Sequence, residues 1–150
     1  MSEHRASIAW KRTSEDFGYD TYNREHVWTF EGGTRVEASS APDFLGDPAA
    51  VDPEEALVAS LSSCHMLTFL ALCARKRYVV DAYADEAVGF MEKNDAGKLW
   101  VSRVVLRPKI AFSGERVPSA EQIDALHERA HHECFIANSV RTDVRVEPAG

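Results

Sequence analysis

One segment constrains the fold of this chain more than any other: residues 52–76 are apolar or small on nearly every side of a helix. The segment begins at Asp52-Pro53-Glu54-Glu55, where Asp52 can cap a helix, Pro53 fits its first turn and Glu55 can complete a capping box. A helix without a polar face is a buried helix. We therefore expect the rest of the chain to wrap around it.

Alternating apolar residues predict strands on both sides of this helix. The stretch before it, residues 6–39, contains several such runs, and Gly32-Gly33 between two of them indicates a hairpin turn. The stretch after it, residues 79–112, alternates in the same way. Pro108 within that second stretch implies an edge strand or a bulge, because proline cannot donate to a central ladder.

A second helix is predicted at about residues 119–134, where Ser119 and Gln122 have the spacing of a capping box and apolar residues follow at helical intervals. A last short strand is expected at about residues 142–147. This order is typical of an α+β fold in which antiparallel sheets wrap two central helices. The length of the chain fits one domain over residues 1–150.

The charge balance argues against two classes of partner. The chain has 17 Lys and Arg against 24 Asp and Glu, a formal net charge of -7, whereas nucleic acids and anionic membranes favour a basic surface. We expect no apolar run long enough to span a membrane, and the polar start lacks the apolar centre of a signal peptide. The predicted location is the cytoplasm, with neither a nucleic acid nor a membrane as partner.

Three cysteines are too few and too scattered for a secreted disulfide scaffold. Cys64 lies within the first helix among small residues, and Cys134 lies near the end of the second helix on its apolar face. Cys73 follows Cys64 by about two and a half helical turns and points roughly away from it, so we predict that Cys73 is a core residue.

Cys64 by itself is most simply a small buried hydrophobe. If the two helices pack through the faces that carry Cys64 and Cys134, however, the sulfurs can meet, and a thiol pair in a reducing compartment points to redox chemistry. A Cys64 thiolate would attack an electrophilic oxygen, and Cys134 would condense with the resulting sulfenic acid. The thiolate needs a nearby cation, which Glu54 could hold; the candidate cations are Arg24, Arg35 and Arg75.

Other kinds of site stay open from the residues alone. A zinc or copper site is suggested by His131, His132 and Cys134 together with Cys64 and His65, although we expect no bound metal. His131 and Cys134 share a helix face, whereas His131 and His132 point in different directions. A Cys-His hydrolase is less favoured, because His65 is adjacent to Cys64 and faces elsewhere on the helix. A non-catalytic dimer that binds a small ligand is a further alternative. No glycine-rich phosphate loop or nucleotide motif is present, so no cofactor is predicted.

Two segments together resemble a known family: Asp52-Pro53-Glu54-Glu55-Ala56-Leu57-Val58-Ala59-Ser60-Leu61-Ser62-Ser63-Cys64 and Ala130-His131-His132-Glu133-Cys134. They are similar to the OsmC/Ohr family of osmotically inducible and organic hydroperoxide resistance proteins, and the likeness in element order covers nearly the whole chain. The resemblance implies a peroxiredoxin-like thiol peroxidase that reduces organic hydroperoxides. It also implies an intertwined homodimer with active sites at its interface, recycled by a thiol reductant, either a dihydrolipoyl group or a small thiol.

The same resemblance implies a role for individual residues. Cys64 would be the peroxidatic thiol, Cys134 the resolving thiol and Glu54 the carboxylate that holds an activating arginine. Arg24 matches the family position of that arginine best, and Arg35 is second. Family members often carry proline directly after the second cysteine, whereas this chain has phenylalanine there, which places it nearer the less characterised OsmC-like branch and leaves its substrate and reductant open.

Overall fold

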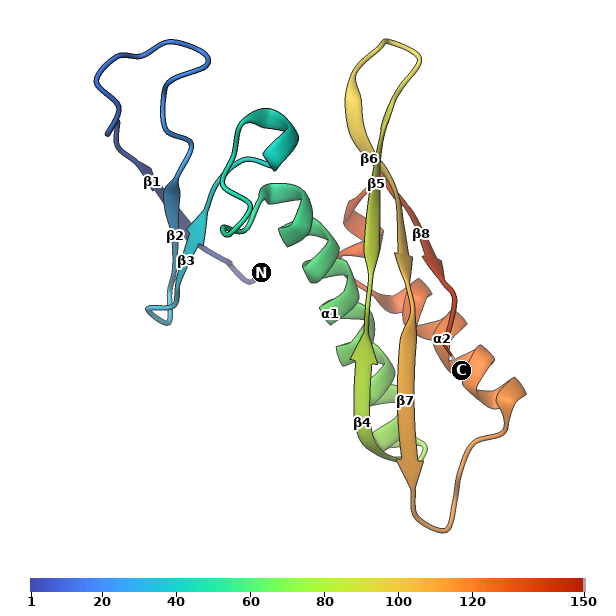
Figure 1. Ribbon diagram of the computed structural model, residues 1–150. Coiled ribbons are helices and arrows are strands. Elements are labelled where there is room, and N and C mark those ends of the chain that lie inside the picture. Colours follow the sequence, from blue (N-terminus) through green and yellow to red (C-terminus); the bar gives the residue numbers. More distant parts are fainter. Residues whose placement is uncertain (150) are drawn as a thin grey trace. The chain divides into compact units, whose positions relative to one another are not determined.

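The computed structural model describes residues 1–149, which divide into two compact units, Met1–Ala56 and the described residues from Leu57 onward. Figure 1 shows two long helices, α1 (Pro53–Arg75) and α2 (Ala120–Glu133), together with several small sheets. The predicted α+β class is therefore confirmed. The single domain over residues 1–150 and the intertwined homodimer stay predictions.

The first unit is built on a three-stranded antiparallel sheet in the order β1-β2-β3. Its strands are β1 (Ala6–Trp10), β2 (His26–Phe30) and β3 (Arg35–Ala38). The turn between β2 and β3 carries Gly33 at a φ of 88°, a left-handed conformation that glycine adopts without steric cost. The hairpin predicted from the two glycines is confirmed. A short 3-10 helix, η1 (Pro42–Phe44), lies in the loop that leads to α1.

Helix α1 begins where its capping residues predict. The Glu55 backbone N–H donates to the Asp52 carboxylate at 2.8 Å, and the Asp52 backbone N–H donates to the Glu55 carboxylate at 3.2 Å. These reciprocal bonds satisfy donors that the first turn of a helix leaves free. The helix ends at Arg75, and Arg77 follows in a left-handed conformation that turns the chain toward the next strand.

Within residues 1–149, helix α1 buries one face, formed by Leu61, His65, Phe69, Leu72 and Cys73. A second stripe is exposed, although three of its four residues are apolar; it consists of Ala59, Ser63, Leu67 and Ala71. By length and composition alone α1 is apolar enough to cross a membrane, which corrects the expectation that no such run exists. The inner face of α1 packs on strands, and this packing explains why the helix is so apolar: it is a core helix.

The second unit contains two small sheets. Strand β4 (Val79–Asp85) pairs with β7 (Pro108–Ser113) in an antiparallel ladder. The hairpin of β5 (Val88–Lys93) and β6 (Leu99–Leu106) forms the other sheet with β8 (Asp143–Val146). Strand β8 runs parallel to β6, which corrects the expectation of antiparallel ladders throughout. A parallel pair requires a long connection between its strands, and α2 lies in the connection here.

The alternating run around Pro108 divides into two strands of different sheets. Pro108 is the first residue of β7, a position where its missing N–H costs no ladder bond, and Arg107 separates β7 from β6. The Arg107 backbone N–H is not left free, since it donates to the Asp85 carboxylate at 2.6 Å. The predicted irregularity at Pro108 is therefore a change of sheet.

Two apolar clusters join these elements. In one, α1 and α2 pack with strands β4 and β7 through buried residues that include Phe69, Leu72 and Leu126. In the other, α1 packs on β6 through Leu61, Val104 and Leu106, with partly buried residues of β8 around them. Helix α2 therefore lies against α1 with its last turn close to the middle of that helix, which brings the two segments that carry Cys64 and Cys134 together.

Candidate functional site

The second unit brings two of the three thiols together. Cys64 on α1 and Cys134 at the C-terminal cap of α2 are free thiols that lie close enough for Cys64 to affect the pKa of Cys134. Cys134 is buried and Cys64 is half-buried. Burial, followed by the neighbouring Cys64, raises the pKa of the Cys134 thiol. A raised pKa keeps Cys134 protonated, so its S–H can donate toward the sulfur of Cys64.

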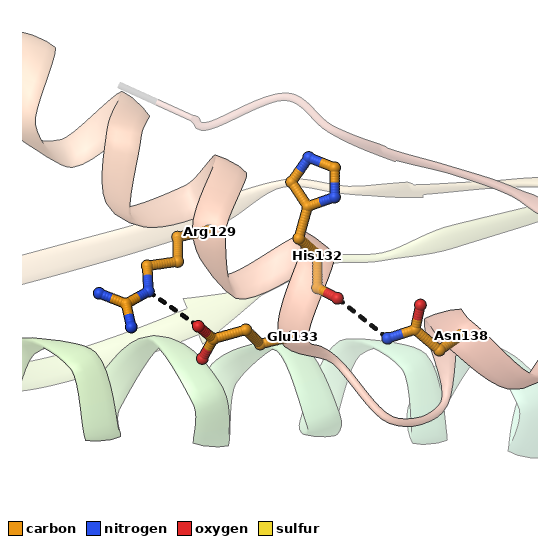
Figure 2. Close-up of polar contacts among 4 residues, drawn as sticks. All are labelled: Arg129, His132, Glu133 and Asn138. Carbon is orange, nitrogen blue, oxygen red and sulfur yellow. Dashed lines mark hydrogen bonds and ion pairs between the residues drawn. The ribbon is translucent and has the colours of Figure 1, made fainter.

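The segment after α2 holds Cys134 in place. Figure 2 shows the last turn of α2, where the Asn138 amide donates to the His132 carbonyl at 2.9 Å. The same amide donates to the Cys134 carbonyl at 3.0 Å, and the Ala137 backbone N–H donates to the Cys134 sulfur at 3.4 Å. The two bonds from the Asn138 amide satisfy carbonyls that a helix end leaves free. This chain therefore closes the turn after its second cysteine with an asparagine side chain and without a proline.

Cys73 is a core residue, as its spacing predicts. It is 1% exposed and packs in the cluster that joins α1, α2, β4 and β7. Burial raises the pKa of its thiol to about 11, so Cys73 stays protonated and unreactive at neutral pH.

The first unit contains a cavity of about 570 Å³ with mainly apolar walls. Two of the residues implied by the family resemblance, Arg24 and Glu54, line it together. Its other walls combine aromatic rings, one imidazole and the residues around η1, namely Trp10, Phe17, Tyr22, His26, Ser39, Ser40, Ala41, Phe44 and Pro53. The size and the few polar groups are typical of a small-molecule site.

The Arg24 guanidinium is held firmly at the wall of this cavity. It donates to the Tyr22 carbonyl at 2.7 Å and to the Tyr19 carbonyl at 2.6 Å, and it lies over the Tyr22 ring at 3.7 Å from the ring centre. A stacked and doubly bonded guanidinium is positioned with little remaining freedom. Arg35 is instead an exposed residue of β3 outside the cavity lining.

Arg24 and Glu54 share the cavity without forming an ion pair. Within residues 1–149 the ion pairs are Arg5–Glu3, Arg129–Glu133 and Arg145–Asp143. Glu54 and Cys64 lie ten positions apart on α1, which corresponds to a rise of about 15 Å. Glu54 and Cys64 of one chain are therefore too far apart for direct contact.

A buried histidine pair lies beside the thiols in the second unit, and the sequence motifs above do not include it. His65 of α1 is 1% exposed and His127 of α2 is 4% exposed, and their Nε2 and Nδ1 atoms are 3.0 Å apart. Their rings stack with centres 5.3 Å apart, and His127 also stacks on Phe69 at 4.4 Å. The only sequence signal for this pair is that both residues fall on the apolar faces of their helices.

The structure does not gather the residues of the metal hypothesis. Cys134 meets Cys64, whereas His131 lines a separate cavity between α2 and β8. In the part of the chain that the structure describes, no three His, Cys, Asp or Glu side chains are already grouped so as to hold an ion. His127 and His131 nevertheless have the i, i+4 spacing that places two imidazoles on one helix face.

Comparison with known proteins adds three likenesses. Residues 46–149 match the family model described as OsmC-like protein. The chain is 50% identical to an OsmC-like protein of unknown function from Vibrio cholerae, with a TM-score of 0.95 over 99% of this chain and 100% of that one. It is 21% identical to the uncharacterized protein YmaD of Bacillus subtilis over 83% of this chain and 84% of YmaD.

A more distant likeness concerns the fold alone. An organic hydroperoxide resistance protein OsmC from Legionella pneumophila is 15% identical, with a TM-score of 0.74 over 100% of this chain and 98% of that one. At such low identity the likeness concerns the arrangement of helices and strands.

Proposed function

The chain belongs to the OsmC-like protein family, and we propose that within this family it is a thiol-dependent peroxidase that reduces organic hydroperoxides. The observation that carries the proposal is the neighbouring pair of free thiols, Cys64 and Cys134, contributed by two different helices. Two neighbouring thiols can join in a disulfide, and this is what a peroxidase with a resolving cysteine requires.

The chemistry proceeds in three balanced steps. The Cys64 thiolate attacks the outer oxygen of the hydroperoxide; the O–O bond breaks, an alcohol leaves after taking up a proton, and Cys64 becomes a sulfenic acid. Cys134 then loses its proton and attacks the Cys64 sulfur, which releases water and forms a disulfide. A dithiol such as a dihydrolipoyl group, or two small thiols, finally reduces the disulfide and is itself oxidised to a disulfide.

The roles of Arg24 and Glu54 require a second copy of the chain. Because Glu54 cannot reach the Cys64 of its own helix, we propose that the homodimer joins Arg24 and Glu54 of one subunit to the thiol pair of the other. The guanidinium would then favour the thiolate form of Cys64 and stabilise the negative charge on the departing oxygen. The firm placement of Arg24 at the cavity wall supports Arg24 over the exposed Arg35 for this role.

The test is a substrate and reductant panel run on the wild type and on Cys64→Ser together. We expect cumene and tert-butyl hydroperoxides to be consumed faster than hydrogen peroxide, and Cys64→Ser to abolish turnover. Cys134→Ser should instead let Cys64 over-oxidise to the sulfinic acid, which mass spectrometry detects as two added oxygens. Unchanged turnover by Cys64→Ser would overturn the proposal, and Cys73→Ser is the matched control that should keep its activity.

The same assay distinguishes the two arginines. Arg24→Gln should lower kcat/KM by about 10² or more, because it removes a fixed charge from the transition state. Arg35→Gln should leave kcat/KM close to the wild-type value, since Arg35 is exposed on β3. The reverse order of effects would move the activating role to Arg35.

A second candidate function is a dimer that binds a small apolar ligand without catalysis, and the aromatic cavity of the first unit favours it. The two functions differ after one equivalent of hydroperoxide is added to reduced protein. The peroxidase loses two hydrogens through a disulfide between Cys64 and Cys134, whereas the binding protein keeps its mass.

A further inference from the structure

The cavity between α2 and β8 collects four side chains that can bind a cation, all from one face of α2. It has a volume of about 300 Å³, and Asp124, His127, Glu128 and His131 line its helix side. These residues have the spacing i, i+3, i+4 and i+7, which aligns them along a helix. Among residues 1–149, the opposite wall, formed by β8 and the residues after it, contributes Val144, Val146 and Pro148. The titratable side chains that line the cavity in this range therefore all come from α2.

The two histidines present ring nitrogens without a partner. His127 is 4% exposed, and its Nε2 atom is buried with no hydrogen-bond partner among the described residues. The Nδ1 atom of half-buried His131 is also buried and without a partner in that part of the chain. A buried polar atom left without a partner costs free energy, so two such atoms beside one cavity point to a missing ligand.

The other ring nitrogen of His127 is already fixed. Its Nδ1 atom lies 3.0 Å from the Nε2 atom of buried His65. When Nδ1 donates to His65, Nε2 carries a lone pair, and this is the arrangement of a metal-binding histidine whose second nitrogen is held by a neighbouring group.

We propose that this cavity is a binding site for a divalent metal ion of the zinc class, with His127 and His131 as imidazole ligands and Asp124 or Glu128 as the carboxylate ligand. Two imidazoles, one carboxylate and water form a donor set that zinc accepts. Asp124 and Glu128 are exposed and free to turn toward the ion, which accounts for the absence of a ready-made group of three donors among residues 1–149. The ion would satisfy the free nitrogens of both histidines.

The test measures Zn²⁺ binding by the full-length protein in a Cys64→Ser/Cys134→Ser background, so that the thiols cannot contribute. Competition with a chromophoric chelator gives the Kd, and Co²⁺ in place of Zn²⁺ reports the coordination geometry through its visible absorption. We expect one ion per chain and an affinity at least about ten-fold weaker in His131→Ala. His132→Ala is the matched control, because His132 is exposed on the same turn and should leave the affinity unchanged.

Glu128→Gln combined with Asp124→Asn is the second variant, since it removes exposed carboxylates and leaves the buried histidines intact. It should also weaken Zn²⁺ binding while circular dichroism shows an unchanged fold. The proposal is overturned if the parent protein binds no Zn²⁺, or if the affinity is the same in the parent, in His131→Ala and in the carboxylate variant. Peroxide turnover of the thiol-containing protein is measured separately, so the failure of one proposal does not conceal the failure of the other.

Discussion

At the scale of single residues, the buried imidazoles of His65 and His127 make the stability of the protein depend on pH. Burial, and to a smaller extent the nearby His127 and His131, lower the pKa of His65 from 6.5 to about 4. Both rings are therefore neutral at physiological pH, and one hydrogen bond links them. Phe69 stacks on His127 and covers one face of that ring with an apolar side chain.

The pKa of His65 gives a testable pH dependence of stability. Because its pKa is lower in the folded than in the unfolded protein, the unfolded chain binds more protons below pH 6.5, and stability falls as the pH drops from about 6.5 toward 4. Between pH 7.5 and pH 5.0 we expect His65 to account for a loss of about 2 kcal/mol in the free energy of unfolding, measured by urea titration.

The control for this measurement is the pH dependence of two variants. His65→Gln should remove this part of the dependence, even if the substitution lowers stability at every pH. His132→Gln, which changes an exposed histidine, should retain the wild-type dependence. Equal dependence in the wild type and His65→Gln would show that His65 does not titrate in this range.

At the scale of elements, the loop around η1 is shaped by one close approach. A Cβ atom added at Gly46 would lie 1.6 Å from the Ser40 carbonyl oxygen and 2.3 Å from the Ser40 carbonyl carbon. Such contacts involve backbone and cannot be relieved by turning a side chain. The same loop contributes Ser40, Ala41 and Phe44 to the cavity of the first unit, so the shape of that cavity depends on this glycine.

We expect Gly46→Ala to lower the free energy of unfolding by about 1–3 kcal/mol, because the loop backbone has to move to accept the methyl group. Peroxide turnover should fall with it if the cavity receives the substrate. Gly32→Ala is the matched control: nothing lies within 4 Å of its added Cβ, and its φ is not positive. Urea unfolding followed by tryptophan fluorescence compares the two, and a Gly46→Ala protein as stable as Gly32→Ala would contradict the loop geometry.

At the scale of the whole molecule, the exposed stripe of α1 requires a partner that covers it. Leu67 is 60% exposed in the middle of a row whose other members are small residues that permit close helix packing. A helix this apolar is stable in water only when such a face is covered. A second copy of the chain is the partner that the proposed composite site also requires.

Leu67→Glu should therefore convert a dimer into monomers, because it places a charge in the proposed apolar contact. Analytical ultracentrifugation of the wild type and the variant over a range of concentrations measures the change. Val117→Glu introduces the same charge at an equally exposed apolar position outside α1 and should remain dimeric. If Leu67→Glu sediments like the wild type, the stripe is not the dimer contact.

The sequence by itself determined the features that depend on neighbours a few residues apart. The reciprocal bonds of Asp52 with Glu55 and of Ser119 with Gln122 occur as their spacing predicts. Gly33 turns the predicted hairpin, and Cys73 lies in the core because helical spacing directs it away from Cys64. Short-range hydrogen bonds and helical periodicity are local, so they can be predicted without the rest of the fold.

Only the tertiary structure decided which distant residues meet. The contact between Cys64 and Cys134 was one possibility among several, and the pairing of His65 with His127 across 62 positions was not predicted. The parallel placement of β8 beside β6 also depends on how α2 returns the chain. Such contacts arise from the packing of whole helix and sheet faces, and no spacing within one segment encodes them.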